Sequence, residues 1–192
     1  PDGLRAAKPA PNPDGTSNQV LEWNQVFIDT LIATNTANSS SQRLGAIVHT
    51  AIFDAYNGIE RRYTPVFVHA TAPRGASRRA AVIAGAYTAL AALFPSQQAA
   101  LSETYAASLA AMSDDDDNGG SRERGIAWGT EVGEEVLAWR AADGFNGSYS
   151  AFTGGMAVVQ WRPTPPAFGP MSAQGLAFTS PFVLVSAWVM TS

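Results

Sequence analysis

From residue 20 onward, apolar side chains recur at spacings of three and four, the pattern of an amphipathic helix. The first such stripe is Val20, Trp23, Phe27 and Leu31, with Ser17 and Asn18 before it as candidate N-caps. A second stripe follows a polar break at 38–41 and is apolar over more than a third of the helix circumference, which predicts a central buried helix. Its members are Leu44, Ile47, Val48, Ala51, Ile52, Ala55, Tyr56 and Ile59.

Three further helices are predicted between residues 77 and 142. The alanine-rich stretch 77–94 ends at Pro95, which also suits the first turn of the next helix. That next helix places Leu101, Tyr105, Leu109 and Met112 on one face, and the fifth, over 121–142, turns Ile126, Val132, Val136 and Leu137 inward. Glycines at 125, 129 and 133 remove side chains from one stripe of the fifth helix, so we expect a neighbouring helix to pack closely there.

Both flanks of this helical region lack periodicity. Residues 1–18 carry four prolines and two glycines and predict a flexible arm, whereas 143–180 is rich in Gly, Pro and Ser with isolated aromatics. We expect this second stretch to be a long ordered loop laid over the bundle. No alternating run of strand length occurs, so the prediction is an all-α bundle of about five main helices over 19–142, followed by a loop and a terminal apolar segment over 143–192.

Residues 181–190 form a strongly apolar segment close to the end of the chain. Five large side chains there, Phe182, Leu184, Val185, Trp188 and Met190, need a surface to pack on. We therefore expect the chain to be half of a larger all-α domain. The segment would pack on a missing C-terminal half or form a homodimer.

Composition narrows the function classes. The net charge is −4 and the eleven arginines are scattered, which argues against nucleic acid as a partner. The chain has no cysteine, and no run of 18 apolar residues predicts a membrane span. It begins at Pro1 rather than at methionine. We expect a processed product or a cloned segment, so localisation stays open and export to the periplasm or medium is compatible with the sequence.

Polar side chains on the second helix are candidates for a structural role. His49 and Asp54 lie five residues apart, about 140° around the helix, so they do not form a ligand pair. His49 is interpreted as a satisfied core or interface histidine. Asp54, Asn57 and Arg61 are three and four apart, which predicts a hydrogen-bonded polar stripe to another helix or to the missing half.

A calcium site is the weakest candidate. Asp114, Asp116 and Asn118, followed by a glycine, reproduce the first half of an EF-hand loop. Position twelve of that loop is Gly125 where a bidentate glutamate is required, so we expect a solvated turn and no metal site.

Four segments together resemble a known family. They are Arg43 to Ile59, Arg140-Ala-Ala-Asp-Gly144, Trp161-Arg-Pro-Thr-Pro-Pro166 and Pro181-Phe182. Their order and spacing are similar to the N-terminal helical half of bacterial vanadium-dependent haloperoxidases, which belong to the superfamily of type-2 phosphatidic acid phosphatases. The resemblance covers roughly residues 19–188 and implies vanadate as the cofactor of the complete enzyme, which would use peroxide to oxidise a halide.

The residues that hold vanadate or phosphate in that family have no counterpart in this sequence. The family places them in its C-terminal half, in Lys-x6-Arg-Pro, Pro-Ser-Gly-His and Ser-Arg-x5-His-x3-Asp segments. The single lysine here, Lys8, is followed seven residues later by Gly15, and no Ser-Gly-His occurs. The histidine position after Ser-Arg is Ala84 in one case and Trp128 in the other.

The expectation is therefore a scaffold part that holds no catalytic and no cofactor-binding residue and is inactive alone. Two alternatives stay open. One is an acid phosphatase of the same superfamily, and the other is a non-catalytic helical interaction module.

Overall fold

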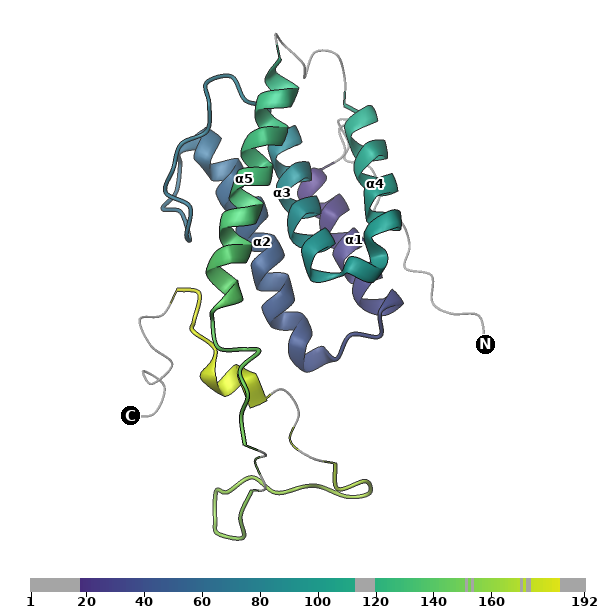
Figure 1. The fold of residues 1–192 in the computed structure, drawn as a ribbon, viewed down its shortest axis with the longest axis vertical. Coiled ribbons are helices and arrows are strands. Elements are labelled where there is room, and N and C mark those ends of the chain that lie inside the picture. Colours follow the sequence, from purple (N-terminus) through teal and green to yellow (C-terminus); the bar gives the residue numbers. More distant parts are fainter. Residues whose placement is uncertain are drawn as a thin grey trace.

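The computed structural model describes residues 18–112, 120–150, 152, 154–169, 171 and 174–183. These residues form five α-helices and no strand, which confirms the all-α prediction (Figure 1). The elements are α1 (Gln19–Ala33), α2 (Asn38–Glu60), α3 (Arg78–Leu93), η1 (Pro95–Gln97), α4 (Gln98–Ala110), α5 (Ser121–Ala141) and η3 (Gln174–Phe178).

Helix α1 begins where the sequence predicts. The side chain of Asn18 accepts hydrogen bonds from the amides of Val20 and Leu21 and so satisfies two of the donors at the helix start. The buried face differs from the predicted stripe: Trp23 and Phe27 are buried, but Val20 is 37% exposed. This helix lies at the edge of the bundle and contacts α3 more than α2.

Helix α2 is central, as predicted, but it starts earlier than the apolar stripe. The polar run 38–41 is its first turn rather than a break before it. Ala37 occupies the N-cap position without a side-chain hydrogen bond, and Ser41 instead donates to the carbonyl of Asn38. From this start α2 packs against both α3 and α5.

The glycines of α5 lie against the backbone of α3, which confirms the predicted close packing. A Cβ atom added at Gly125 would overlap the carbonyl oxygen of Ser77, and one at Gly129 would overlap that of Ala81. At Gly133 the added Cβ would lie 2.8 Å from Cβ of Thr88. These approaches let α3 bury almost its whole surface between α2, α4 and α5.

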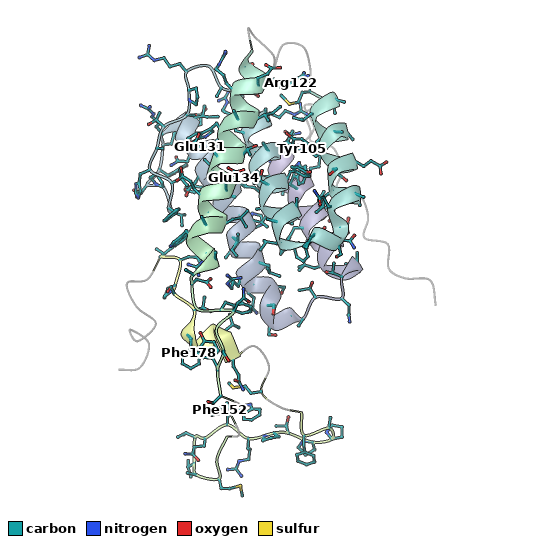
Figure 2. The ribbon with its side chains drawn as sticks, in the orientation of Figure 1. Tyr105, Arg122, Glu131, Glu134, Phe152 and Phe178 are labelled. Carbon is teal, nitrogen blue, oxygen red and sulfur yellow. The ribbon has the colours of Figure 1, made fainter. Side chains whose placement is uncertain are left out.

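Helix α4 covers the outer side of α3. The rings of Tyr87 and Tyr105 stack with their centres 4.3 Å apart, and the Tyr87 hydroxyl hydrogen-bonds to Ser102 over 2.9 Å. Figure 2 shows Tyr105 on the side of α4 that faces the bundle. Among the described helices no single one is long and apolar enough to cross a membrane. Helix α3 together with Pro95–Ala110 is long and apolar enough, but the pair is bent by 115°.

The chain after α5 divides into two parts. Residues 143–150 and 174–183 pack together beside the start of α2 and the end of α5, where Tyr149 stacks on Phe178 with ring centres 4.1 Å apart. Residues 154–169, here called the projecting segment, extend away from the bundle (Figure 1). The expectation of a loop laid over the bundle is therefore wrong for this segment. Within this segment Trp161 packs on Phe152, which lies just before the segment, and not on the bundle.

Candidate functional site at the buried arginine and aspartate cluster

The polar group with the most contacts lies where α5 ends. Arg140 is in the last turn of α5, and Asp143 follows two residues after the end of the helix. Oδ1 of Asp143 accepts a 2.9 Å hydrogen bond from the amide of Phe145, a local bond that holds the turn and aims Oδ2 back at the bundle. A carboxylate is thus fixed at the base of the helices.

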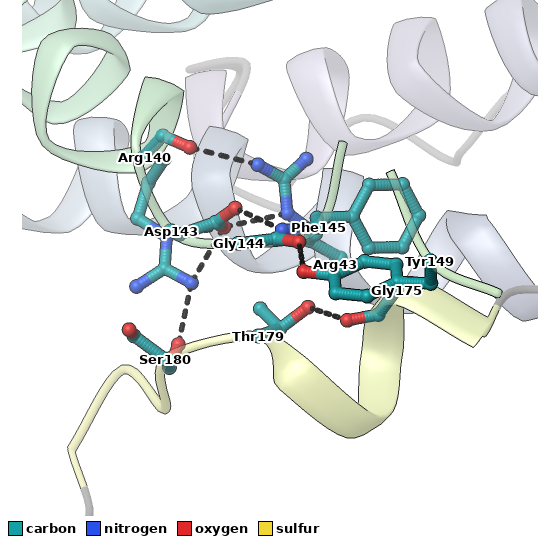
Figure 3. Close-up of polar contacts among 9 residues, drawn as sticks. All are labelled: Arg43, Arg140, Asp143, Gly144, Phe145, Tyr149, Gly175, Thr179 and Ser180. Carbon is teal, nitrogen blue, oxygen red and sulfur yellow. Dashed lines mark hydrogen bonds and ion pairs between the residues drawn. The ribbon is translucent and has the colours of Figure 1, made fainter. Parts of the chain in front are cut away.

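Two guanidinium groups converge on Oδ2 of Asp143 (Figure 3). Arg43, in the second turn of α2, donates through Nε over 2.7 Å and through Nη2 to the carbonyl of Arg140 over 2.9 Å. Arg140 donates to the same carboxylate oxygen through Nη2 over 2.7 Å and through Nε over 3.1 Å. The cluster therefore joins the start of α2 to the end of α5, which are about 100 residues apart.

The same arginines hold the returning chain. Nη2 of Arg140 donates to the carbonyl of Ser180 over 2.6 Å, and the amide of Ser180 donates to the carbonyl of Asp143 over 2.8 Å. The guanidinium of Arg140 lies 3.9 Å from the centre of the Phe182 ring, and that of Arg43 lies 4.6 Å from the centre of Phe145. These cation–π contacts cover the charged groups with aromatic surface.

All three charged side chains are buried. Arg43 is 8% exposed, Arg140 1% and Asp143 4%, so two positive charges and one negative charge lie away from water. Burial alone raises the pKa of Asp143, but the bonds from Arg43 and the Phe145 amide and both positive charges outweigh it, and the pKa is lowered. Burial lowers the pKa of Arg140, and Asp143 partly opposes that change.

The chemistry of this cluster is that of binding and positioning. The lowered pKa of Asp143 favours its ionised form, so this carboxylate is not suited to exchange protons during a reaction near neutral pH. Nε and Nη2 of both arginines donate to protein acceptors. The cluster can hold chain segments together and can attract a negative group.

The predicted polar stripe on α2 does not form one unit. His49 is half-buried and its Nε2 lies 3.0 Å from Oδ1 of Asn24 on α1, which fits the interpretation as a satisfied interface histidine. Burial lowers the pKa of His49, so the neutral ring is favoured. Arg61 is exposed and forms the left-handed C-cap of α2.

The expectation that Asp54 and Asn57 reach another helix is wrong, because both bind the loop that follows their own helix. The carboxylate of Asp54 accepts from the amides of Val66, Phe67 and Val68 at 2.8–2.9 Å. The side chain of Asn57 binds the backbone of Arg62 and Tyr63. These side chains replace the missing backbone partners of a loop that has no regular structure.

The other sequence predictions fall beyond the placed part of the chain. Asp114, Asp116 and Asn118, and the apolar segment from residue 184 onward, lie outside the described residues. Within the described residues no group of three or more His, Asp or Glu side chains is placed to hold a metal ion.

Arg43, Arg140 and Asp143 belong to the segments that carry the resemblance, but the sequence did not predict that they form one site. A signal was present for Arg43, since it lies four residues before Ile47 and eleven before Asp54, on the stripe that is buried. The meeting of residues 43 and 143 is a long-range contact that no local pattern contains.

No family model matches this chain, and searches of curated proteins and of solved structures return no match either.

Proposed function

We propose that this chain is the helical scaffold part of a vanadium-dependent haloperoxidase-like enzyme. The support is that three of the four segments carrying the resemblance meet in one cluster. Arg43 begins the first segment, Arg140 and Asp143 lie in the second, and Phe182 ends the last; all are in contact. The order and spacing of these segments along the chain therefore allow them to meet in one packed cluster.

The proposal places the oxyanion pocket in residues beyond this sequence. A vanadate ion needs several converging donors and an axial imidazole. Here the two arginines are engaged by Asp143, and His49, the histidine of α2, is turned to Asn24. The scaffold would hold its helices in place while another part of the enzyme binds vanadate.

The experiment asks whether the reading frame continues past Ser192 and, where it does, compares this chain with the longer product. A reading frame that continues past Ser192 into Ser-Gly-His and Ser-Arg-x5-His segments, with a product that brominates an acceptor dye only when vanadate and peroxide are present, would support the proposal. Hydrolysis of p-nitrophenyl phosphate without bromination would favour the acid phosphatase instead. Tight stoichiometric binding of vanadate by residues 1–192 alone would contradict the scaffold role.

A non-catalytic interaction module is the second candidate, and the projecting segment favours it. Met156 is 84% exposed, Val158 87% and Val159 100%, an unusual concentration of exposed apolar side chains. Trp161, Thr164 and Pro166 also line an open hollow there. Light scattering at increasing protein concentration tests this reading: dimer formation that Val158→Ser/Val159→Ser abolishes would favour the module, and a strict monomer would remove its support.

A further inference from the structure

One nitrogen of the buried cluster has no partner among the described residues. Nη1 of Arg140 is fully buried and makes no hydrogen bond, although Nε and Nη2 of the same group are bonded. Figure 3 shows this nitrogen on the side of the guanidinium that points away from Asp143. A buried guanidinium donor without an acceptor is costly, and native proteins seldom leave one.

The charge of the cluster points to what is missing. Arg43 and Arg140 supply two positive charges, and Asp143 supplies one negative charge, so among the described residues the cluster carries one excess positive charge. Both carboxylate oxygens of Asp143 already accept hydrogen bonds, from the two arginines and from the Phe145 amide. A water molecule could fill the hydrogen bond but would not compensate the charge.

The position of the cluster allows access. It lies at the end of the bundle, between the helices on one side and η3 with the returning chain on the other, rather than at the centre of the core (Figure 3). On the side of Phe182 the cover is thin, because Phe182 is half-buried and the next residue, Val183, is 82% exposed. Nη1 of Arg140 is itself buried, so a small group reaches it when the Phe182 ring moves aside.

We propose that Arg140 binds a single carboxylate group through Nη1 and that this group completes the charge balance of the cluster. A carboxylate fits because it carries one negative charge and is planar like the guanidinium that receives it. It is supplied either by a small free carboxylate or by an acidic side chain of a second copy of this chain. This proposal does not depend on the haloperoxidase proposal, because it rests on the charges of Arg43, Arg140 and Asp143 and not on the binding of vanadate.

The first test places the carboxylate inside the chain. Phe182→Glu brings a carboxylate within reach of Arg140, and Phe182→Gln is the matched neutral control that loses the same ring. We expect the glutamate variant to melt several degrees above the glutamine variant at pH 7. Equal melting temperatures would overturn the proposal.

The second test uses the wild-type chain with acetate as the probe and chloride at the same ionic strength as the reference. We expect acetate to raise the melting temperature by about 3–6 °C at ten times its Kd. Phe182→Glu should not show this rise. A saturable change in tryptophan fluorescence that Trp139→Phe removes would locate the site beside Arg140, from which the Trp139 ring is 4.6 Å away.

The acetate and fluorescence measurements distinguish a free carboxylate from one supplied by a second copy. Because they use the wild-type chain, they decide the outcome even if both Phe182 variants fail to fold. If a second copy supplies the carboxylate, the acetate effect should shrink as protein concentration rises; for a free ligand it should not. An acetate effect on the wild type that is linear in acetate concentration and leaves tryptophan fluorescence unchanged is a general salt effect, and it would overturn the proposal.

Discussion

Asp143 is the residue on which the end of the bundle depends. It accepts hydrogen bonds from three guanidinium nitrogens and one amide, and its removal would leave two buried positive charges facing each other. We expect Asp143→Asn to lower the free energy of unfolding by about 3–5 kcal/mol, measured by urea denaturation. Glu60→Gln is the control: it breaks the exposed pair with Arg78 and should cost less than about 1 kcal/mol. Similar losses for both variants would contradict the importance given to the cluster.

The same residue predicts a pH dependence. Because the pKa of Asp143 is lowered in the folded state, the unfolded chain takes up a proton first as pH falls. The contribution of Asp143 is therefore complete above the unfolded pKa of about 3.9 and is lost as pH falls through the lower folded pKa. We expect the stability difference between wild type and Asp143→Asn to narrow below about pH 4. A difference independent of pH between 3 and 7 would show that Asp143 acts by shape alone.

Asp54 leads to a prediction that concerns only the loop amides that it binds. Its two oxygens accept from three consecutive amides, and an asparagine keeps one oxygen as an acceptor while its NH₂ group faces donors. Asp54→Asn should speed hydrogen exchange of the amides of Val66, Phe67 and Val68 at least tenfold. Amides in the middle of α5 serve as the internal control. Unchanged exchange in the loop would mean that packing of Val68, not the carboxylate, holds it.

The polar residues of α2 show what a single sequence can and cannot give at this scale. Helical spacing places Asp54 and Asn57 on one side of the helix, and the structure confirms that both are buried and bonded. Their partner, the loop over 61–68, has no periodicity that would reveal its path. The path of this loop determines which groups the Asp54 carboxylate binds, so the helical spacing alone could not predict its partners.

At the scale of elements, the glycines of α5 carried the most reliable information. Glycine is unfavourable inside a helix, so three at a spacing of four indicate that packing compensates the cost. We expect Gly129→Ala to lower the free energy of unfolding by about 1–3 kcal/mol despite the better helix propensity of alanine, because the new methyl group meets the backbone of Ala81. Glu131→Ala, an exposed change on the same helix, is the control, and thermal melting measures both. An increase in stability for Gly129→Ala would show that the two helices can separate at little cost.

The start of α2 was harder to predict than its middle. Asparagine and serine have modest helix propensity, so the run 38–41 looks like a break when the apolar stripe alone is followed. In the structure the helix begins at Asn38, and Arg43, in the second turn, is anchored on Asp143. A tertiary ion pair of this kind overrides weak local preference, and it joins residues too far apart in sequence for a local window to include both.

At the scale of the whole molecule, periodicity predicted the class and the five helices but not the direction of the chain after them. Isolated aromatic residues in 143–180 suggested contacts with the bundle. Phe145 does make one, because it lies against Arg43 of α2, whereas Tyr149 stacks on Phe178 within the same stretch. Figure 2 shows Phe178 near the end of the bundle and Phe152 farther out, where its partner is Trp161. An aromatic residue in a loop indicates that it packs, but the sequence does not say on what.

The projecting segment leads to a prediction about the independence of the bundle. Its described contacts are internal or reach only Phe152 just before it: Trp161 packs on Phe152, the amide of Gly155 donates to the carbonyl of Trp161, and Arg162 donates to that of Met156. Replacing residues 154–169 with a four-residue Gly-Ser linker removes none of the cluster around Asp143 and shortens a loop, which costs little chain entropy. We therefore expect the melting temperature of the helices to change by less than about 2–4 °C, equivalent to about 1 kcal/mol for a chain of this size.

The matched comparison is Tyr149→Ala, which leaves the projecting segment intact but removes a ring that stacks on Phe178 next to the cluster. This single substitution should lower the melting temperature more than the loss of the whole segment, because it removes the stacked ring and the hydrogen bond that the Tyr149 hydroxyl donates to the carbonyl of Gly144. Circular dichroism at 222 nm follows the helices in both proteins. If the deletion proves the more damaging change, residues 154–169 must stabilise the bundle through contacts other than those inside the segment, and they could not be a surface kept free for a partner.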